Sequence, residues 1–322
     1  MLTSVSQPRV VISALVVAAL LGIGAIAVHQ ARRPEPERAT GAGPAATAPA
    51  PTSPHRSPAT QTPDPSPTKS DPPVRSPTGP DQTLARNSLY TVDLGDRSVR
   101  CSMRVRRPKP PIADADLAPY LRTVVKCLVK AFSVPLSAKG FALQTPKIKT
   151  YRKTAKTACG KFGQRGAPAY YCSANQTIYW PLTGDDGSEA YTFARLGYVG
   201  LLAHEFGHHL QATTGMLGEY GQRYTRAKGR SDRQLLSRRL ELQAQCFEGV
   251  FLTVAERELT LTGDDRYQLR VWHGFTGDED PPASRKPDHG SSAAQIRWLD
   301  RGLDSQDFGR CNTWTAKASA VR

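Results

Sequence analysis

Large apolar side chains are almost absent from residues 34–80, which instead hold 14 of the 26 prolines in this 322-residue sequence. Such a segment buries too little apolar surface to offset chain entropy, so we expect residues 32–85 to form a disordered linker. About 237 residues follow it, at 86–322, and these suffice for one sizeable core. A wholly disordered chain, a collagen and a multi-span membrane protein are therefore excluded.

Acidic residues are in the minority, at 28 against 43 Lys and Arg, and residues 86–322 carry about +13 of the net +15. The basic charge therefore belongs to the predicted domain. A solvated surface explains it, and anionic envelope polymers or lipids are candidate partners. Nucleic acid is not an expected partner, because no basic, aromatic-interleaved motif is present.

A single hydrophobic run precedes the linker. Residues 10–28 are nineteen consecutive uncharged, mostly apolar positions, which as a helix could just cross a bilayer. The small-x-small sequence at residues 25–27 also fits a cleaved secretory signal, although the run is longer than most such signals. We expect residues 1–31 to be an uncleaved single-pass membrane anchor, with the C-terminal domain outside the cytoplasm. If the signal is cleaved, the protein is secreted.

Cysteine is absent from the first hundred residues, and all six cysteines follow the linker. An even number in an exported chain indicates disulfides, and the lack of a Cys-x-x-Cys pair argues against a zinc ribbon. Six cysteines allow fifteen pairings, and free buried thiols are a further alternative. The pairing that we expect is Cys101 with Cys127, Cys159 with Cys172, and Cys246 with Cys311.

Hydrophobic periodicity predicts an α+β fold, mainly helical, with a small antiparallel sheet. The helices expected from helical spacing are residues 114–132, 189–211, 232–254 and 291–300. The strands expected from alternation and β-rich composition are residues 146–152, 169–172 and 176–180.

The helix expected over residues 189–211 contains the motif H-E-x-x-H. Positions four apart lie on one face, so His204 and His208 can present imidazole nitrogens to one Zn²⁺ while Glu205 reaches a metal-bound water. The alternative is a helix with two solvated histidines. We favour the metal site because residues 198–203 are uncharged and the motif lies mid-helix, where a rigid site belongs.

Two histidines and a water leave one protein ligand missing from a tetrahedral catalytic site. No later histidine completes an H-E-x-x-H-x-x-G-x-x-H pattern, so we expect a glutamate on a second helix. Glu241 is the best candidate, because an acid inside an otherwise apolar helix is costly unless it is paired or bound to metal. Glu248 on the same helix is the alternative.

Other motifs accompany this pair of helices. They are R-L-E-L-Q-A-Q-C at residues 239–246, T-A-C-G at 157–160, H-G-S-S at 289–292 and R-W at 297–298. In these motifs the sequence resembles the neutral zinc metallopeptidase family of bacterial membrane-anchored proteins, over roughly residues 146–311. The resemblance implies a zincin-like fold, one Zn²⁺ per chain held by His204, His208 and Glu241, and Glu205 as general base.

The expected function is zinc-dependent hydrolysis of a peptide or protein substrate, with Glu205 moving the water's proton to the leaving amine. One departure from the family pattern touches the site, because Gln245 stands where the family has Asp. An Asp there could accept an N–H from a ligand histidine. The carbonyl of Gln245 can still accept that bond but brings no negative charge, so we expect weakened activity. The alternative function is a weakly active or inactive metallopeptidase-like envelope protein with a binding or regulatory role.

Three further histidines have less defined surroundings. His289, in a polar loop before the last helix, either stabilises the oxyanion of the tetrahedral intermediate as a catalytic residue or caps that helix. His209 is expected to face away from the metal, since adjacent helical positions point about 100° apart. His273 has no motif around it, and we expect it on the surface.

Overall fold

The computed structural model describes residues 80–95, 98–105, 112–152, 154–162, 169–182, 194–279 and 287–322. The predicted membrane anchor and most of the predicted linker lie outside these ranges. Within them, no helix combines the length and apolar character that crossing a bilayer requires.

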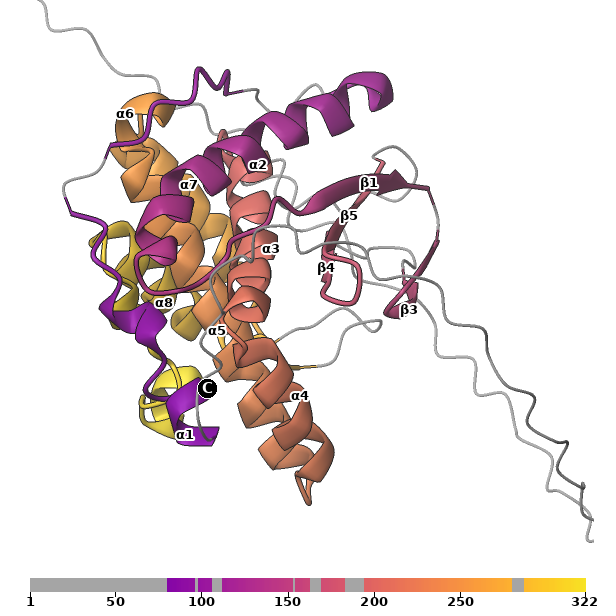
Figure 1. Cartoon of the computed structure of the whole chain (residues 1–322), viewed down its shortest axis with the longest axis vertical. Helices are drawn as coiled ribbons and strands as arrows, with labels where there is room; N and C mark the ends of the chain where they lie inside the picture. Colours follow the sequence, from indigo (N-terminus) through magenta and orange to yellow (C-terminus); the bar gives the residue numbers. More distant parts are fainter. Residues whose placement is uncertain are drawn as a thin grey trace, which may run out of the picture. The chain divides into compact units, whose positions relative to one another are not determined.

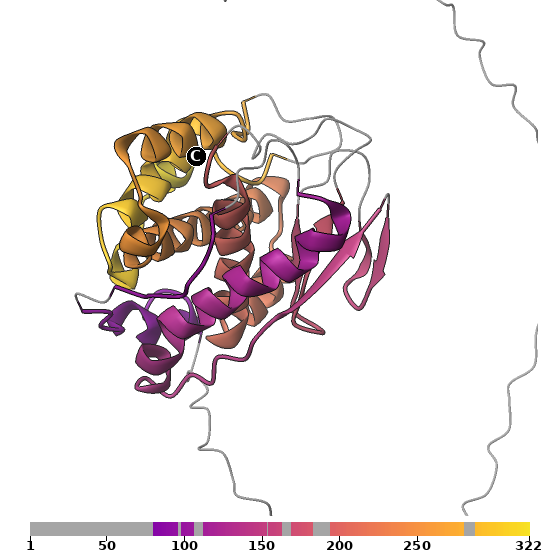
Figure 2. The ribbon, with the colours of Figure 1, turned by 90° about the horizontal axis from the view of Figure 1, so that it is seen from above.

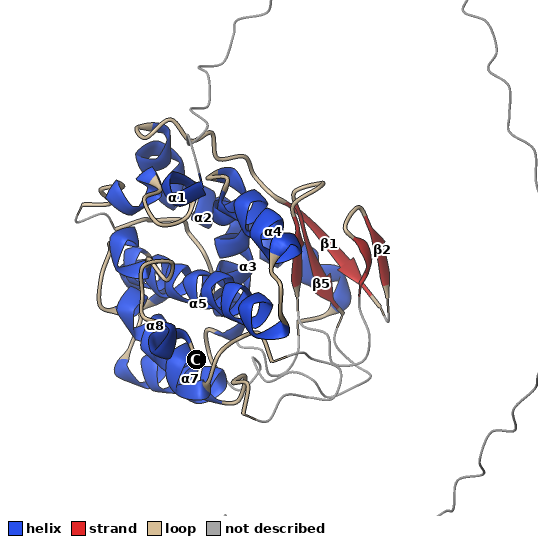
Figure 3. Ribbon diagram, turned by 90° about the horizontal axis from the view of Figure 1, so that it is seen from below, coloured by secondary structure: helices blue, strands red, loops and turns tan. Residues whose placement is uncertain are grey.

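The described part of the chain is mainly helical, with two small sheets. Its helices are α1 (Pro80–Thr83), α2 (Asp114–Ser137), α3 (Gly197–Thr213), α4 (Met216–Arg226), α5 (Arg230–Val254), α6 (Glu256–Leu259), α7 (Gly263–Gly274) and α8 (Ser292–Leu303). Its strands are β1 (Lys147–Tyr151), β2 (Ala155–Thr157), β3 (Gly160–Phe162), β4 (Tyr170–Cys172) and β5 (Thr177–Pro181). Short 3-10 helices are η1 (Ser88–Thr91), η3 (Phe308–Cys311) and η4 (Ala318–Val321). The strands gather on one side of α3, and α7 and α8 lie on the other (Figures 1 and 3).

The helix α2 begins at the predicted residue, Asp114, and ends at Ser137, five residues beyond its predicted end. Pro135 lies in its last turn, and Leu136 continues the buried apolar stripe, so the helix persists past residue 132. This stripe packs α2 against both α3 and β1 (Figure 2).

The helix α3 starts at Gly197, eight residues later than predicted. Residues 194–196 form a turn, and residues 189–193 lie outside the described ranges. In the turn, the Arg195 side chain donates to Asp265 at the start of α7 (Nη2 to Oδ2, 2.7 Å) and to the carbonyl of Leu259 (2.9 Å). These bonds fasten the turn to α7, and the helix begins after it.

The larger sheet has the strand order β1-β5-β4. The predicted antiparallel pairing holds for β4 and β5, with Tyr171 opposite Ile178. However, β1 runs parallel to β5, with Ile148 level with Ile178, so the prediction of an antiparallel sheet was wrong for this pair. Alternation marks which segments are strands, but their pairing depends on the path of the chain between them.

All three predicted disulfides are present: Cys101–Cys127, Cys159–Cys172 and Cys246–Cys311. The second joins the hairpin of β2 and β3, which the sequence analysis missed, to β4. The third fastens α5 to the 3-10 helix η3 near the end of the chain.

The helices α3 and α5 cross closely, and this crossing brings the two predicted ligand segments side by side. A Cβ on Gly207 of α3 would lie 3.0 Å from the Cα of Ala244 on α5. Glycine permits this approach because it has no side chain to separate the two backbones. His204 and His208 flank Gly207, and Glu241 lies one turn before Ala244. Two small residues thus set the distance between the proposed ligands.

A second close crossing joins α5 to α8. A Cβ on Gly249 would lie 2.7 Å from the backbone nitrogen of Leu303, and one on Gly302 would lie 2.7 Å from that of Val250. The core extends from Leu84, just before the predicted domain start at residue 86, to Val321. Both ends of the described chain therefore help to enclose α5.

Candidate metal centre

Three donor atoms from α3 and α5 face one another. The Nε2 atoms of His204 and His208 each lie 3.3 Å from Oε2 of Glu241. One ligand atom from each of the three side chains lies within 4.8 Å of the others, and no other such group of three occurs in the described ranges. The structure therefore brings together the residues predicted to hold the metal.

This donor set fits Zn²⁺, which takes imidazole nitrogen and carboxylate oxygen ligands and in catalytic sites keeps a fourth position open. Burial acts to lower the pKa of His208, but Glu241 outweighs burial and raises this pKa above its ordinary value, to about 9. Burial raises the pKa of Glu241, but the neighbouring histidines hold it well below its ordinary value. Opposite charges thus stabilise each other, and a bound cation would take the place of the proton on the histidine.

Glu205 lies beside this group and is 5% exposed. Burial raises its pKa, and Glu241 adds to the rise, while the two site histidines and the backbone amide of Tyr171 on β4 oppose it. A raised pKa makes a carboxylate a better proton acceptor, which is the direction that a general base requires.

His289 completes the surroundings of Glu241, with its Nε2 3.7 Å from Oε2 of that glutamate. On the other side of the ring, Nδ1 lies 2.6 Å from Oδ1 of Asp288. The N-cap of α8 is Ser291, whose side chain accepts from the amide of Ala294, so the capping alternative for His289 was wrong. The oxyanion role stays a prediction.

The loop that carries His289 is anchored by Asp278. Its Oδ1 accepts from the amide of His289 (3.0 Å), and its Oδ2 accepts from the amide of Gly290 (2.8 Å). Arg238 on α5 donates to the same Oδ2 at 2.8 Å. The helix that bears Glu241 therefore also holds the His289 loop in place. Sequence analysis missed Arg238, Asp278 and Asp288, and only the adjacency of Asp288 to His289 offered a local signal.

The family described as "Putative neutral zinc metallopeptidase" matches residues 101–314. The chain belongs to this family. The uncharacterized protein YpfJ of Escherichia coli K12 is 35% identical over 191 residues, covering 54% of this chain and 63% of YpfJ. The uncharacterized protein Rv2575 of Mycobacterium tuberculosis is 28% identical over 201 residues, covering 53% of this chain and 63% of that relative. The match thus spans less than two thirds of either relative, and no solved structure matches the chain.

Membership in a zinc metallopeptidase family implies zinc as the metal for the group of His204, His208 and Glu241.

The sequence analysis missed one hydrogen-bond partner of this group, Gln211. Gln211 accepts from Nδ1 of His208 at 2.9 Å and is fully buried. Its position three residues after His208, on the same helix face, was the available signal.

Gln245, the departure from the family pattern, forms no hydrogen bond with either ligand histidine in the described structure. Its amide nitrogen donates to Oε2 of Glu248 at 3.0 Å and lies 2.8 Å from Nε2 of His273 on α7. The same His273 nitrogen lies 3.1 Å from Oε1 of Glu248. Gln245 therefore does not form the bond to a ligand histidine that its carbonyl could accept. Its side chain instead joins a separate buried cluster with Glu248 and His273.

The cluster also decides two other predictions. Glu248 is fully buried within the cluster and lies outside the donor group. The alternative third ligand is therefore not grouped with His204 and His208. His273 is 3% exposed, and its predicted surface position was wrong because the sequence analysis missed α7, which packs against α8. His209 faces away from the metal group as predicted, with Nδ1 2.9 Å from the Tyr171 hydroxyl and Nε2 2.7 Å from the carbonyl of Gln144.

Proposed function

We propose that this chain is an extracytoplasmic zinc-dependent metallopeptidase that hydrolyses peptide bonds. The observation that carries the proposal is the convergence of His204, His208 and Glu241 within 4.8 Å, beside the buried Glu205. Family membership supports the same class of activity. We also propose that the fold is zincin-like, because the motif helix α3 packs against β4, an edge strand of the sheet.

His204, His208 and Glu241 would hold one zinc ion, which when bound supplies a Lewis acid that polarises the substrate carbonyl and acidifies a water molecule. Glu205 would accept a proton from the attacking water as the oxygen of that water bonds to the carbonyl carbon. The same carboxyl group then donates the proton to the departing amine nitrogen as the carbon–nitrogen bond breaks.

His289 would act on the charge that develops at the carbonyl oxygen. Asp288 accepts from Nδ1, and when the ring also carries a proton on Nε2, that nitrogen can donate to the oxygen. A donor placed in advance near that oxygen stabilises the transition state more than the substrate. The bonds of Asp278 to the loop hold the ring beside Glu241.

We propose that the domain lies outside the cytoplasm, anchored by residues 10–28, or secreted if that segment is cleaved. The three disulfides support this compartment, because structural disulfides form mainly in oxidising environments. The proposed partners are a peptide or protein substrate, the membrane, and anionic envelope polymers attracted by the basic domain.

A weakly active or inactive envelope protein is the alternative function. One motivation is Gln245, which bonds to Glu248 and His273 and supports neither ligand histidine. The basic charge of residues 86–322 is the other motivation.

Zinc content and chelator-sensitive cleavage of an unstructured protein, measured on the full chain in detergent, test the proposal. We expect Glu205→Gln to keep its zinc and lose hydrolysis, because Glu205 acts on the water and is not a ligand. Glu219→Gln on α4 is the matched control and should retain both. Zinc without turnover in the unmodified chain would favour the alternative, and loss of zinc in Glu205→Gln would show that the roles are misassigned.

A further inference from the structure

The ring of His208 is held on the side away from the metal group as well. Its Nδ1 lies 2.9 Å from Oε1 of Gln211, one turn later on α3. The Gln211 amide nitrogen donates to the backbone carbonyl of Leu240 (2.8 Å) and to Oε1 of Gln243 (3.0 Å), both on α5. Gln211 therefore bridges the ligand histidine and the helix that carries Glu241.

These bonds determine the orientation of the Gln211 side-chain amide. The carbonyl of Leu240 can only accept, so the Gln211 atom facing it must be the nitrogen, and the oxygen must face His208. An acceptor beside Nδ1 requires that this nitrogen carry a proton. The neutral ring then has its lone pair on Nε2, the atom that faces Glu241.

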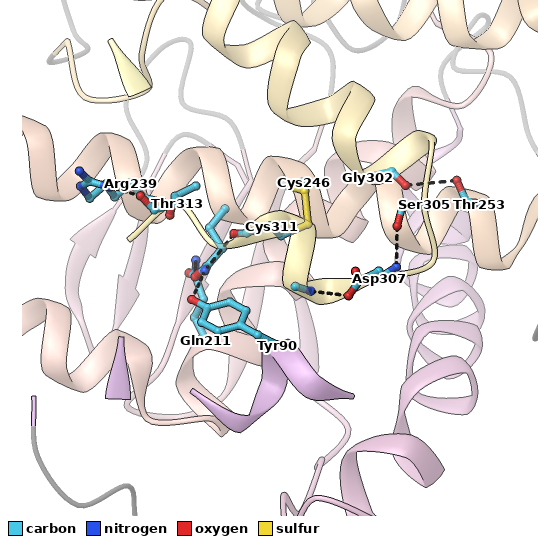
Figure 4. Close-up of a disulfide and its surroundings, with 12 residues drawn as sticks. Tyr90, Gln211, Arg239, Cys246, Thr253, Gly302, Ser305, Asp307, Cys311 and Thr313 are labelled. Carbon is cyan, nitrogen blue, oxygen red and sulfur yellow. Dashed lines mark hydrogen bonds between the residues drawn. A yellow bond between two sulfur atoms is a disulfide. The ribbon is translucent and has the colours of Figure 1, made fainter. Parts of the chain in front are cut away.

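Gln243 on α5 is oriented in turn by Tyr90 and by the Cys311 segment. Its amide nitrogen donates to the hydroxyl of Tyr90 (2.8 Å) and to the carbonyl of Cys311 (3.3 Å). The Tyr90 hydroxyl donates to the carbonyl of Leu84 at 2.9 Å, so it is available to accept from Gln243. The oxygen of Gln243 is thereby left to face Gln211, which lies beside Tyr90 and the Cys311 segment in Figure 4.

We propose that Gln211 is a positioning residue of the metal centre. It holds His208 in the form with a proton on Nδ1 and directs Nε2 to the metal, and Gln243 holds Gln211 in the orientation that this requires. The inference rests on the proposed zinc site but not on peptide hydrolysis. Loss of an outer hydrogen-bond partner typically lowers metal affinity about 10- to 100-fold.

The test compares two variants of the full chain by competition for zinc with a chelator. Gln211→Met keeps the side-chain volume and helix propensity but removes the acceptor, and we expect its zinc affinity to fall about 10- to 100-fold. Thr253→Val is the matched control, because it removes a side-chain hydrogen bond of the same helix α5, to the carbonyl of Leu303 (2.8 Å), and leaves the network of Gln211 in place. Its stability should fall while its zinc affinity stays within about threefold of the unmodified chain.

A spectroscopic measurement covers the case in which Gln211→Met does not fold. In the zinc-loaded, nitrogen-15-labelled chain, we expect the Nδ1 proton of His208 to resonate separately and to exchange slowly with water. Rapid exchange of that proton, or equal zinc affinities of Gln211→Met and Thr253→Val, would overturn the positioning role. An unmodified chain that takes up no zinc would refute the proposed function, and this inference with it.

Discussion

Replacing Gln245 by Asp restores the residue of the family pattern, and the structure predicts that the change harms the protein. The Gln245 amide donates to Glu248 at 3.0 Å, and Glu248 is fully buried. An ionised Asp cannot donate, and it would stand beside another carboxyl group in a site without solvent. We therefore expect Gln245→Asp to destabilise the fold without improving the metal centre.

The size of the effect follows from these contacts. Loss of a buried hydrogen bond to a charged group costs about 1.5–3 kcal/mol. Keeping an Asp with an ordinary pKa near 3.9 neutral at pH 7 costs about 4 kcal/mol, since each pKa unit is worth about 1.4 kcal/mol. A neutral Asp could donate to Glu248 in place of Gln245, which leaves the cost of protonation as the net loss, about 4 kcal/mol.

Urea unfolding and chelator competition for zinc measure the two consequences separately. We expect the free energy of unfolding of Gln245→Asp to fall by about 4 kcal/mol, with zinc affinity within about threefold of the unmodified chain. Gln234→Asp, on the same helix but outside the buried cluster, controls for the helix propensity of Asp. If Gln245→Asp instead binds zinc or cleaves substrate about tenfold better at unchanged stability, residue 245 acts on the metal centre and our reading of the cluster is wrong.

Three further predictions concern the ligands, the pH dependence and the disulfides. Glu241→Gln should lose most bound zinc while Glu248→Gln keeps it, and metal analysis showing the reverse would move the third ligand to Glu248. Burial raises the pKa of Asp265, but its arginine partner lowers it below the ordinary value, so this group stabilises the fold above about pH 4 and loses its effect as the pH falls. Unfolding experiments should therefore show Asp265→Asn less stable by about 1–3 kcal/mol at pH 7, with the difference narrowing in acid, whereas a difference independent of pH would exclude the ion pair. Removing the Cys246–Cys311 bridge, which spans 65 residues, should cost about 4 kcal/mol and weaken zinc binding, whereas removing the other two bridges should leave zinc affinity unchanged.

Much of the candidate site could be predicted from the sequence because its information is local. The spacing of His204 and His208 places both on one face of any helix that contains them. The cost of burying a lone acid in an apolar helix pointed to Glu241. The cysteine count and the export signal indicated disulfides in the same way, although the choice among fifteen pairings needed the structure.

Features that join segments far apart in the sequence could be settled only by the tertiary structure. The parallel pairing of β1 with β5 depends on the chain path between them, and the burial of His273 depends on how α7 packs against its neighbours. The partner of Gln245 was misjudged for the same reason. Helical spacing places it on a face near Glu241, but α7 and Glu248 supply the atoms that its amide meets.

The same distinction applies to the chemistry of the ligands. The sequence determined that two imidazoles and a carboxylate would be available to one metal ion. Which nitrogen of His208 carries the proton depends on Gln211, which is oriented by the Leu240 carbonyl of α5 and by Gln243. Gln243 is oriented in turn by the Cys311 carbonyl of the C-terminal segment. A tautomer depends on hydrogen-bond partners contributed by several segments, and those partners meet only when the chain has folded.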